Sequence, residues 1–191
     1  MTIDHDDVDV VWKIVVGGAG GVGKTTILHR YVYNEFVDDM QLTVGVQFHS
    51  MHVNKNGVNV ALALWDLGGQ ERFRFILPSY IKGSVAALIL FDMGRIQTFL
   101  EVDEWAAMIR ENAGVIPVVL VGTKFDTITP QEAAEMHAAG EKKAKDLGCV
   151  AYISTSSKLG YNVKETVDYM LDYLFFINTH TVSTEPVMPS T

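Results

Sequence analysis

The sequence contains a single cysteine, Cys149, among its 191 residues. One thiol cannot form an internal disulfide, so the small secreted folds that depend on several cross-links are excluded and a reducing compartment is favoured. Proline is also scarce, with five residues, while 48 % of the residues are hydrophobic and 20 % are charged. These proportions exclude collagen-like and intrinsically disordered chains and are typical of a globular protein.

Basic residues and long apolar runs are scarce as well. Lysine and arginine number 15 against 23 acidic residues, and the net charge is −8. Because nucleic-acid binders usually carry a basic surface, we expect no nucleic-acid partner. The most apolar stretches, Val85–Phe91 and Val115–Val121, are far shorter than the roughly 18 residues that span a bilayer. The acidic first ten residues do not resemble a secretory signal, and we expect a soluble, cytoplasmic monomer.

The chain is slightly longer than one typical domain. Four aspartates lie among the first nine residues, and residues 178–191 are polar with two prolines. Neither segment has the apolar periodicity of a packed helix or strand. We therefore predict one folded domain over residues 10–177, an acidic flexible tail at 1–9 and a second flexible tail at 178–191.

Short β-branched runs alternate with amphipathic stretches through the predicted domain. An Asn-Gly pair at 56–57 predicts a hairpin between the second and third strands. The alternation predicts an α/β fold, with a mixed, mostly parallel six-stranded sheet and helices on both faces. The expected strands are Val10–Val16, Val46–Val53, Val58–Trp65, Val85–Phe91, Pro117–Val121 and Val150–Ser154. The expected helices are Thr25–Tyr33, Thr98–Asn112, Pro130–Leu147 and Asn162–Ile177.

A glycine-rich segment follows the first predicted strand. Residues 17–25 read GGAGGVGKT and fit G-x-x-x-x-G-K-[ST]. Glycines allow successive backbone N–H groups to surround phosphate oxygens at the start of a helix. Lys24 can reach the β- and γ-phosphates, and the Thr25 hydroxyl can bind Mg²⁺. The expected phosphate-binding residues are Gly20, Gly21, Val22, Gly23, Lys24, Thr25 and Thr26.

A second motif follows the third predicted strand, where residues 65–72 read WDLGGQER. Asp66 can hold a water on Mg²⁺, and the Gly69 N–H can reach a γ-phosphate. The Gln70 amide can orient an attacking water. The segment therefore predicts hydrolysis of a nucleoside triphosphate.

The base is predicted from two later segments, GTKFD at 122–126 and TSSK at 155–158. The Asp126 carboxylate supplies two acceptors for the two N–H donors on the edge of guanine, which adenine lacks. The aliphatic part of Lys124 can cover a base. A backbone N–H in the second segment can donate to the guanine carbonyl. This pattern argues against an adenine-nucleotide kinase.

These segments, in this order, resemble the Ras superfamily of small GTPases over about Val11–Phe176. The resemblance implies a small G domain, a P-loop NTPase fold, over residues 10–177, with GTP or GDP and Mg²⁺ as ligands. Thr123 stands where Asn is commoner, as in Rho-type members, and Ser157 where Ala is usual. The residues implied to contact the nucleoside are Phe36, Thr123, Lys124, Asp126, Ser156, Ser157 and Lys158.

The resemblance also implies a switch threonine. Thr43 lies 18 residues after Thr25, in LTVGVQF, which is similar to T-I-G-x-x-F of Rab members. It implies Mg²⁺ ligation by Thr25, Thr43 and Asp66, and catalysis by Gln70, Lys24, Gly69 and Thr43. Because residues 36–45 contain no arginine, we expect slow hydrolysis until a partner supplies one.

Partner proteins are expected to read two switch segments, one around Thr43 and one around Gly69 and Gln70. Phe48, Trp65 and Tyr80 match the aromatic triad through which Rab members meet effectors, and exchange factors and GTPase-activating proteins are also implied. Rab-like members act in vesicle trafficking. The sequence ends in Pro-Ser-Thr, and residue 2 is Thr, so we expect no direct lipid anchor. Two alternatives stay open: the protein works in the cytosol, or it reaches membranes through a partner.

The expected function is a molecular switch, and one alternative stays open: a guanine-nucleotide-bound adaptor that does not hydrolyse GTP. Gln70 and Thr43 argue against it. His49 and His52 are three apart on a predicted strand and should face opposite sides rather than share a metal. Arg72 and Arg74 could serve catalysis, but they are expected to make surface contacts.

Overall fold

The computed structural model describes residues 8–38, 40–55 and 57–181, with the backbone alone at 179–181. The predicted segments 1–9 and 178–191 therefore lie mostly outside the described residues. The strands are β1 (Val10–Gly17), β2 (Val46–Lys55), β3 (Val58–Leu67), β4 (Ala86–Asp92), β5 (Val118–Thr123) and β6 (Ala151–Ser154). The helices are α1 (Lys24–Tyr33), η1 (Glu71–Ile76), α2 (Leu77–Ile81), α3 (Ile96–Leu100), α4 (Val102–Ala113), η2 (Phe125–Thr127), α5 (Pro130–Leu147) and α6 (Val163–Thr181).

The six strands form one sheet in the order β2-β3-β1-β4-β5-β6. β2 and β3 are antiparallel and the other neighbouring pairs are parallel, so the predicted mixed, mostly parallel sheet is confirmed. Val46 and Leu67 are register partners at one end of the β2–β3 hairpin. Because β1, β3, β4, β5 and β6 run parallel, their carboxyl ends meet at one edge of the sheet, where α/β folds bind ligands.

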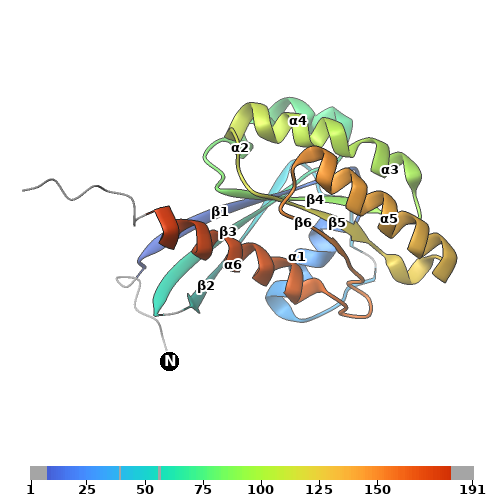
Figure 1. The fold of residues 1–191 in the computed structure, drawn as a ribbon. Helices are drawn as coiled ribbons and strands as arrows, with labels where there is room; N and C mark the ends of the chain where they lie inside the picture. Colours follow the sequence, from blue (N-terminus) through green and yellow to red (C-terminus); the bar gives the residue numbers. More distant parts are fainter. Residues whose placement is uncertain (1–7, 39, 56, 182–191) are drawn as a thin grey trace, which may run out of the picture.

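Helices cover both faces of the sheet (Figure 1), as predicted: α1 and α6 lie on one face, and α2, α3, α4 and α5 on the other. Ile27 of α1 and Leu171 of α6 pack with Leu62 and Leu64 of β3 in one buried core. Trp105 of α4 belongs to the second core on the opposite face. All residues of β4 are buried, because helices cover this strand from both sides.

Three helix predictions need correction. The single helix expected over Thr98–Asn112 is two helices, because the turn at Glu101 separates α3 from α4. The helical segment from Glu71 to Ile81 was not predicted, since its short 3₁₀ turn and Pro78 show no helical periodicity. α6 continues past its expected end at Ile177.

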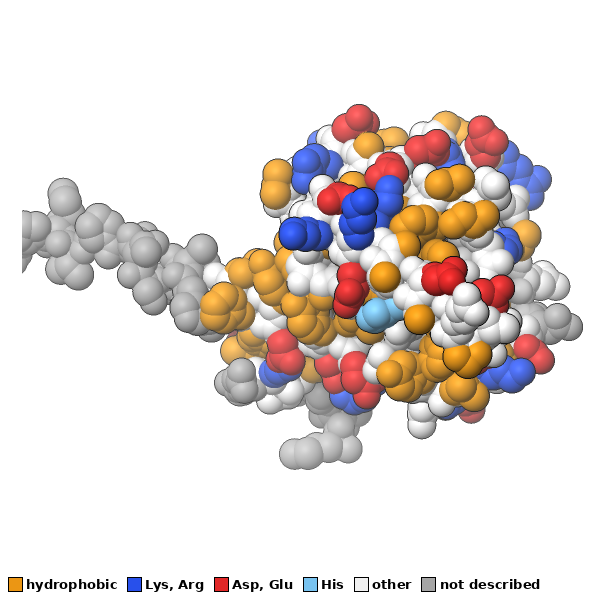
Figure 2. All heavy atoms as spheres, turned by 45° about the vertical axis from the view of Figure 1, so that its right-hand side comes forward, with side chains coloured by type: hydrophobic (Ala, Val, Ile, Leu, Met, Phe, Trp, Pro, Cys, Tyr) orange, Lys and Arg blue, Asp and Glu red, His pale blue; other side chains and the backbone are white. Residues whose placement is uncertain are grey.

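The face that includes α5, shown in Figure 2, has acidic and basic side chains next to one another with hydrophobic side chains between them. No helix among the described residues is both long enough and apolar enough to cross a membrane.

Candidate functional site

A cavity of about 320 Å³ lies at the carboxyl edge of the sheet. The segments that follow β1, β3, β5 and β6 meet there, so residues more than a hundred positions apart share one wall. The predicted site residues that line it are Gly20, Gly21, Val22, Gly23, Lys24, Thr25, Thr26, Phe36, Thr43, Gly69, Gln70, Thr123, Lys124, Asp126, Ser157 and Lys158. Asp66 and Ser156 are buried outside this lining.

The loop before α1 has a backbone that requires glycine. Gly18, Gly21 and Gly23 have φ angles of 138°, 71° and 96°, which side chains other than glycine adopt at a cost. A Cβ on Gly18 would also lie 2.2 Å from the Leu90 carbonyl oxygen. The loop therefore fits closely against β4 and leads directly into the first turn of α1.

Lys24 is buried in the first turn of α1, with 5 % of its surface exposed. Its Nζ donates hydrogen bonds to the carbonyl oxygens of Gly18 at 2.7 Å and Ala19 at 2.8 Å. Burial lowers the pKa of Lys24 to about 8. A buried ammonium in the wall of a cavity provides a site for a phosphate group.

The three predicted metal ligands are in contact with one another. Asp66 Oδ2 accepts hydrogen bonds from Thr25 Oγ1 at 2.5 Å and Thr43 Oγ1 at 3.1 Å, and the two hydroxyl oxygens are 2.6 Å apart. Asp66 Oδ1 is buried without a hydrogen-bond partner among the described residues, and burial raises the pKa of this carboxyl. An oxygen-only cluster with a buried, unpartnered carboxylate oxygen fits the requirements of Mg²⁺.

The segment after β3 touches both the phosphate loop and the Thr43 segment. A Cβ on Gly69 would lie 2.4 Å from the carbonyl carbon of Ala19, so only glycine fits there. The Gly68 N–H donates to the Gly45 carbonyl at 2.7 Å. Gln70 Oε1 accepts a hydrogen bond from Arg72 Nε at 2.8 Å. Arg72, expected to make surface contacts, therefore holds the side chain proposed to orient water.

The segments predicted to bind the base also line the cavity, through Thr123, Lys124, Asp126, Ser157 and Lys158. Lys124 has a φ angle of 58°, an uncommon conformation for a residue with a side chain, and Asp126 lies in the short turn η2 that follows. Ser156 supports its loop instead of lining the cavity: its N–H donates to the Tyr161 carbonyl at 3.1 Å. Ser157 and Lys158 therefore remain the candidates for a backbone contact to the base.

A family model described as the Ras family matches residues 13–175, which extend from β1 into α6. The chain belongs to the Ras family. The fold is accordingly the small G domain of the P-loop NTPases. Membership implies, in general, that the chain binds GTP and GDP and acts as a GTPase switch. Ras-family GTPases generally bind these nucleotides together with Mg²⁺, and regulators and effectors read their state.

The aromatic residues expected to meet effectors form a row of neighbouring rings in this Ras-family chain. The Phe48 and Trp65 rings are 5.1 Å apart, and the Trp65 and Tyr80 rings 5.7 Å apart. Trp65 packs on the core opposite to that of Leu64, as its place in the strand predicts. Phe48 is 53 % exposed and lies at the outer end of the row.

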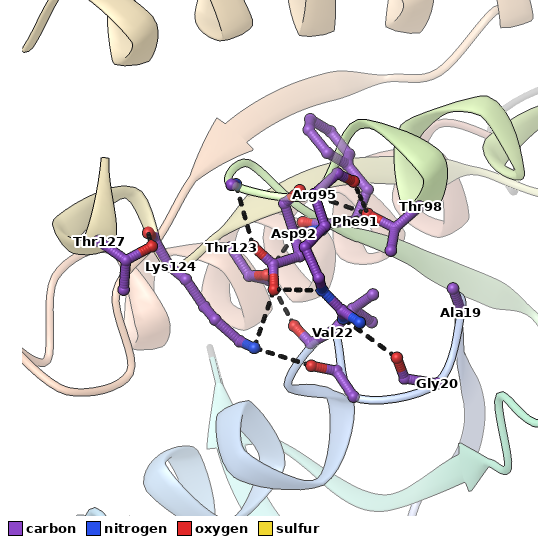
Figure 3. A network of polar contacts seen from close by, with 12 residues as sticks. Ala19, Gly20, Val22, Phe91, Asp92, Arg95, Thr98, Thr123, Lys124 and Thr127 are labelled. Carbon is purple, nitrogen blue, oxygen red and sulfur yellow. Dashed lines mark hydrogen bonds and ion pairs between the residues drawn. The ribbon is translucent and has the colours of Figure 1, made fainter. Parts of the chain in front are cut away.

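The sequence reasoning missed two residues beside the phosphate loop, Asp92 and Arg95. Asp92 is the last residue of β4, and its buried carboxylate contacts both Arg95 and Lys124 (Figure 3). Its position at the carboxyl end of a buried strand is the signal that could have identified it. Arg95 follows in an irregular loop and carries no such signal.

His49 and His52, which were not expected to share a metal, lie on one strand. His49 is half-buried on β2, and His52 is exposed on the same strand. No group of three or more His, Cys, Asp or Glu side chains among residues 8–38, 40–55 and 57–181 could hold a metal ion. Cys149 packs at the edge of a core, and burial raises its pKa to about 11.

Proposed function

We propose that the chain is a Mg²⁺-dependent GTPase that hydrolyses GTP slowly on its own and changes partners with its nucleotide state. The observation that carries the proposal is the contact between Thr25, Thr43 and Asp66 beside the buried ammonium of Lys24. Two buried groups of opposite charge, each close to the cavity, suit a bound triphosphate with its cation.

The phosphate end of the cavity holds the charge of the nucleotide in this proposal. Lys24 exchanges its two carbonyl partners for β- and γ-phosphate oxygens. Thr25, Thr43 and Asp66 hold Mg²⁺, which neutralises negative charge on the phosphates when bound. Thr43 lies in the segment between α1 and β2, and in this proposal it is the ligand whose position depends on the γ-phosphate.

Hydrolysis requires a correctly oriented water. Gln70 orients the water, and the Gly69 N–H donates to the γ-phosphate. The hydrogen bond from Arg72 limits the positions that the Gln70 amide adopts. We expect slow intrinsic turnover because residues 36–45 contain no arginine, and we expect an activating partner to supply one.

Guanine is recognised at the other end of the cavity. Asp126 accepts the two N–H donors of the base, while the aliphatic part of Lys124 and the ring of Phe36 cover its faces. All three residues line the cavity, which supports this assignment.

The partners are proteins that recognise the two switch segments. We assign effector contact to Phe48, Trp65 and Tyr80, and this triad together with the Thr43 segment favours a Rab-like subtype with a role in vesicle trafficking. Exchange factors and GTPase-activating proteins act on the same surface. The proposed location is the cytoplasm, with recruitment to membranes through partners.

The decisive experiment identifies the nucleotide that copurifies with the full chain and then measures single-turnover hydrolysis of GTP with Mg²⁺. We expect guanine nucleotide, and we expect Gln70→Leu to retain it while hydrolysing GTP at least about tenfold more slowly. Gln131→Leu is the matched control, because Gln131 lies on α5 outside the cavity. Copurified adenine nucleotide would contradict guanine recognition. A wild-type chain that holds GTP without hydrolysing it would support the adaptor instead.

A further inference from the structure

Three consecutive carbonyl groups of the phosphate loop accept hydrogen bonds from side chains of neighbouring segments (Figure 3). The donors come from the loop after β4 and from the end of β5. The three hydrogen bonds are Arg95 Nη2 to Gly20 O at 3.1 Å, Lys124 Nζ to Gly21 O at 2.8 Å and Thr123 Oγ1 to Val22 O at 2.7 Å.

Fixing a carbonyl also fixes the N–H on the other side of the same peptide plane. In a trans peptide the C=O and N–H point in opposite directions. The hydrogen bonds to these carbonyls therefore fix the N–H groups of Gly21, Val22 and Gly23, which point away from the three donors, and all three residues line the cavity. A cation on a carbonyl also polarises the peptide and strengthens its N–H as a donor.

One carboxylate organises both cations. Asp92 Oδ2 lies 2.9 Å from Arg95 Nε and 2.9 Å from Lys124 Nζ, and its side chain is 5 % exposed. Asp92 Oδ1 accepts a hydrogen bond from the Gly94 N–H at 3.0 Å. Burial raises the pKa of Asp92, but the hydrogen bonds from Lys124 and Arg95 outweigh it and hold the pKa below its ordinary value.

Arg95 is well placed to act on the loop without entering the cavity. It is outside the cavity lining, and its side chain is 47 % exposed. A Cβ on Gly21 would lie 3.6 Å from Arg95 Nη2 and 3.7 Å from Leu42 Cδ2. The loop that carries Arg95 is fixed in turn, because Thr98 Oγ1 donates to the Arg95 carbonyl at 2.8 Å.

We propose that Asp92 and Arg95 are positioning residues of the phosphate loop that set how long the nucleotide stays bound. The inference rests on the proposed binding of guanine nucleotide in this cavity. Arg95 fixes the Gly20 carbonyl directly, and Asp92 holds Arg95 and Lys124 on their carbonyls. Loss of either side chain frees peptide planes whose N–H groups hold the phosphates, and the nucleotide leaves sooner.

The sizes of the effects differ because the contacts differ. Arg95→Ala removes one partly exposed hydrogen bond to the loop, so we expect release of GDP to accelerate about three- to tenfold. Arg95→Lys keeps a cation beside Asp92 and should fall between the alanine variant and the wild type. Asp92→Asn weakens both cation contacts, and we expect an acceleration of more than about tenfold.

The test measures release of GDP labelled with a fluorescent methylanthraniloyl group from the full chain, with excess Mg²⁺ and again with EDTA. Single-turnover hydrolysis of GTP is measured on the same variants. Arg110→Ala is the matched control, since Arg110 is an exposed arginine on α4. Thermal melting of each nucleotide-free variant separates positioning from loss of folding.

Each outcome decides the inference. Faster release by Arg95→Ala with unchanged melting, and partial rescue by Arg95→Lys, would support it. Release from Arg95→Ala at the rate of Arg110→Ala would overturn the inference and leave the proposed function intact. The inference would also be overturned if, across all variants, the acceleration of release were proportional to the decrease in melting temperature, because loss of folding would then explain it. A wild-type chain that retains no labelled GDP would overturn the proposed function and this inference with it.

Discussion

Burial and charge oppose each other most directly at Lys24. The ammonium is almost fully buried and donates to two loop carbonyls, and burial lowers its pKa to about 8. At neutral pH most Lys24 side chains are still charged, but the charged form loses its majority above about pH 8. A phosphate beside it would stabilise the charged form and raise this pKa.

Affinity for GDP should therefore depend on pH through Lys24. A pKa that rises on binding makes the affinity highest below the pKa of the empty site and weaker as pH increases above it. We expect a constant Kd for GDP up to about pH 8 and a loss of up to about tenfold per pH unit above it. Titration calorimetry between pH 6.5 and 9 measures this change.

Lys24→Ala provides the control for this pH profile. The variant should bind GDP weakly, and its affinity should not follow the same slope, because the titrating group is gone. Equal slopes in the variant and the wild type would assign the pH dependence to another group, for example the base itself.

At the level of single residues, the sequence predicts those site residues that belong to a short local motif. Lys24 and Asp126 could be predicted because each stands in a short segment whose chemistry depends on neighbouring residues. Arg95 could not, because its partner is the backbone carbonyl of Gly20, 75 positions away. The sequence also could not predict that the Ser156 N–H donates within its own loop, because its partner is the Tyr161 carbonyl.

Among the elements, the closest contact between the two switch segments is a backbone contact. The Gly68 N–H donates to the Gly45 carbonyl at 2.7 Å. A Cβ on Gly68 would lie 2.4 Å from the Gly45 oxygen and 3.1 Å from the Thr43 oxygen. The space between these segments therefore accepts only glycine in this state.

Gly68→Ala should separate the two switch segments. The added methyl group moves the Thr43 backbone away from β3, which weakens the contact between Thr43 and Asp66. We expect a loss of roughly 1–3 kcal/mol in stability and slower single-turnover hydrolysis of GTP. Urea unfolding measures the loss of stability, and the hydrolysis assay measures the rate. Wild-type values in both would contradict the prediction that the space between the segments accepts only glycine.

The strands could be predicted more completely than the helices. β2 and β3 were expected because an Asn-Gly turn joins two β-branched runs, and both strands extend slightly beyond the expected bounds. The break at Glu101 was missed because the hydrogen bonds on its two sides, Glu101 N to Gln97 O at 3.3 Å and Trp105 N to Glu101 O at 3.2 Å, are long but present. Such a weak interruption has no sequence signature.

In the whole molecule, one sheet separates two cores, and the phosphate loop and the segment after β3 are anchored in different ones. Ala19 and Val22 of the phosphate loop belong to the core on the α1 side. Leu67, just before Gly68, belongs to the other core. A ligand that joins these loops therefore connects both halves of the protein.

Nucleotide should consequently stabilise the entire domain. At a ligand concentration of 100 times Kd, the gain is about 2.7 kcal/mol, which corresponds to roughly 5–11 °C in Tm for a chain of this size. We expect this shift with GDP and Mg²⁺ and a smaller one when EDTA replaces Mg²⁺, because the buried Asp66 carboxylate then lacks its cation. Thermal unfolding measures the shifts, and an equal shift with ADP would contradict guanine selectivity.

The β2–β3 hairpin gives the two switch segments a common support. Val46 begins β2 directly after one segment, Leu67 ends β3 directly before the other, and the two residues are register partners. The two switch segments therefore continue from the paired open end of one β-hairpin, and the turn that joins β2 to β3 lies at its other end. A protein that binds either end alone senses the position of both.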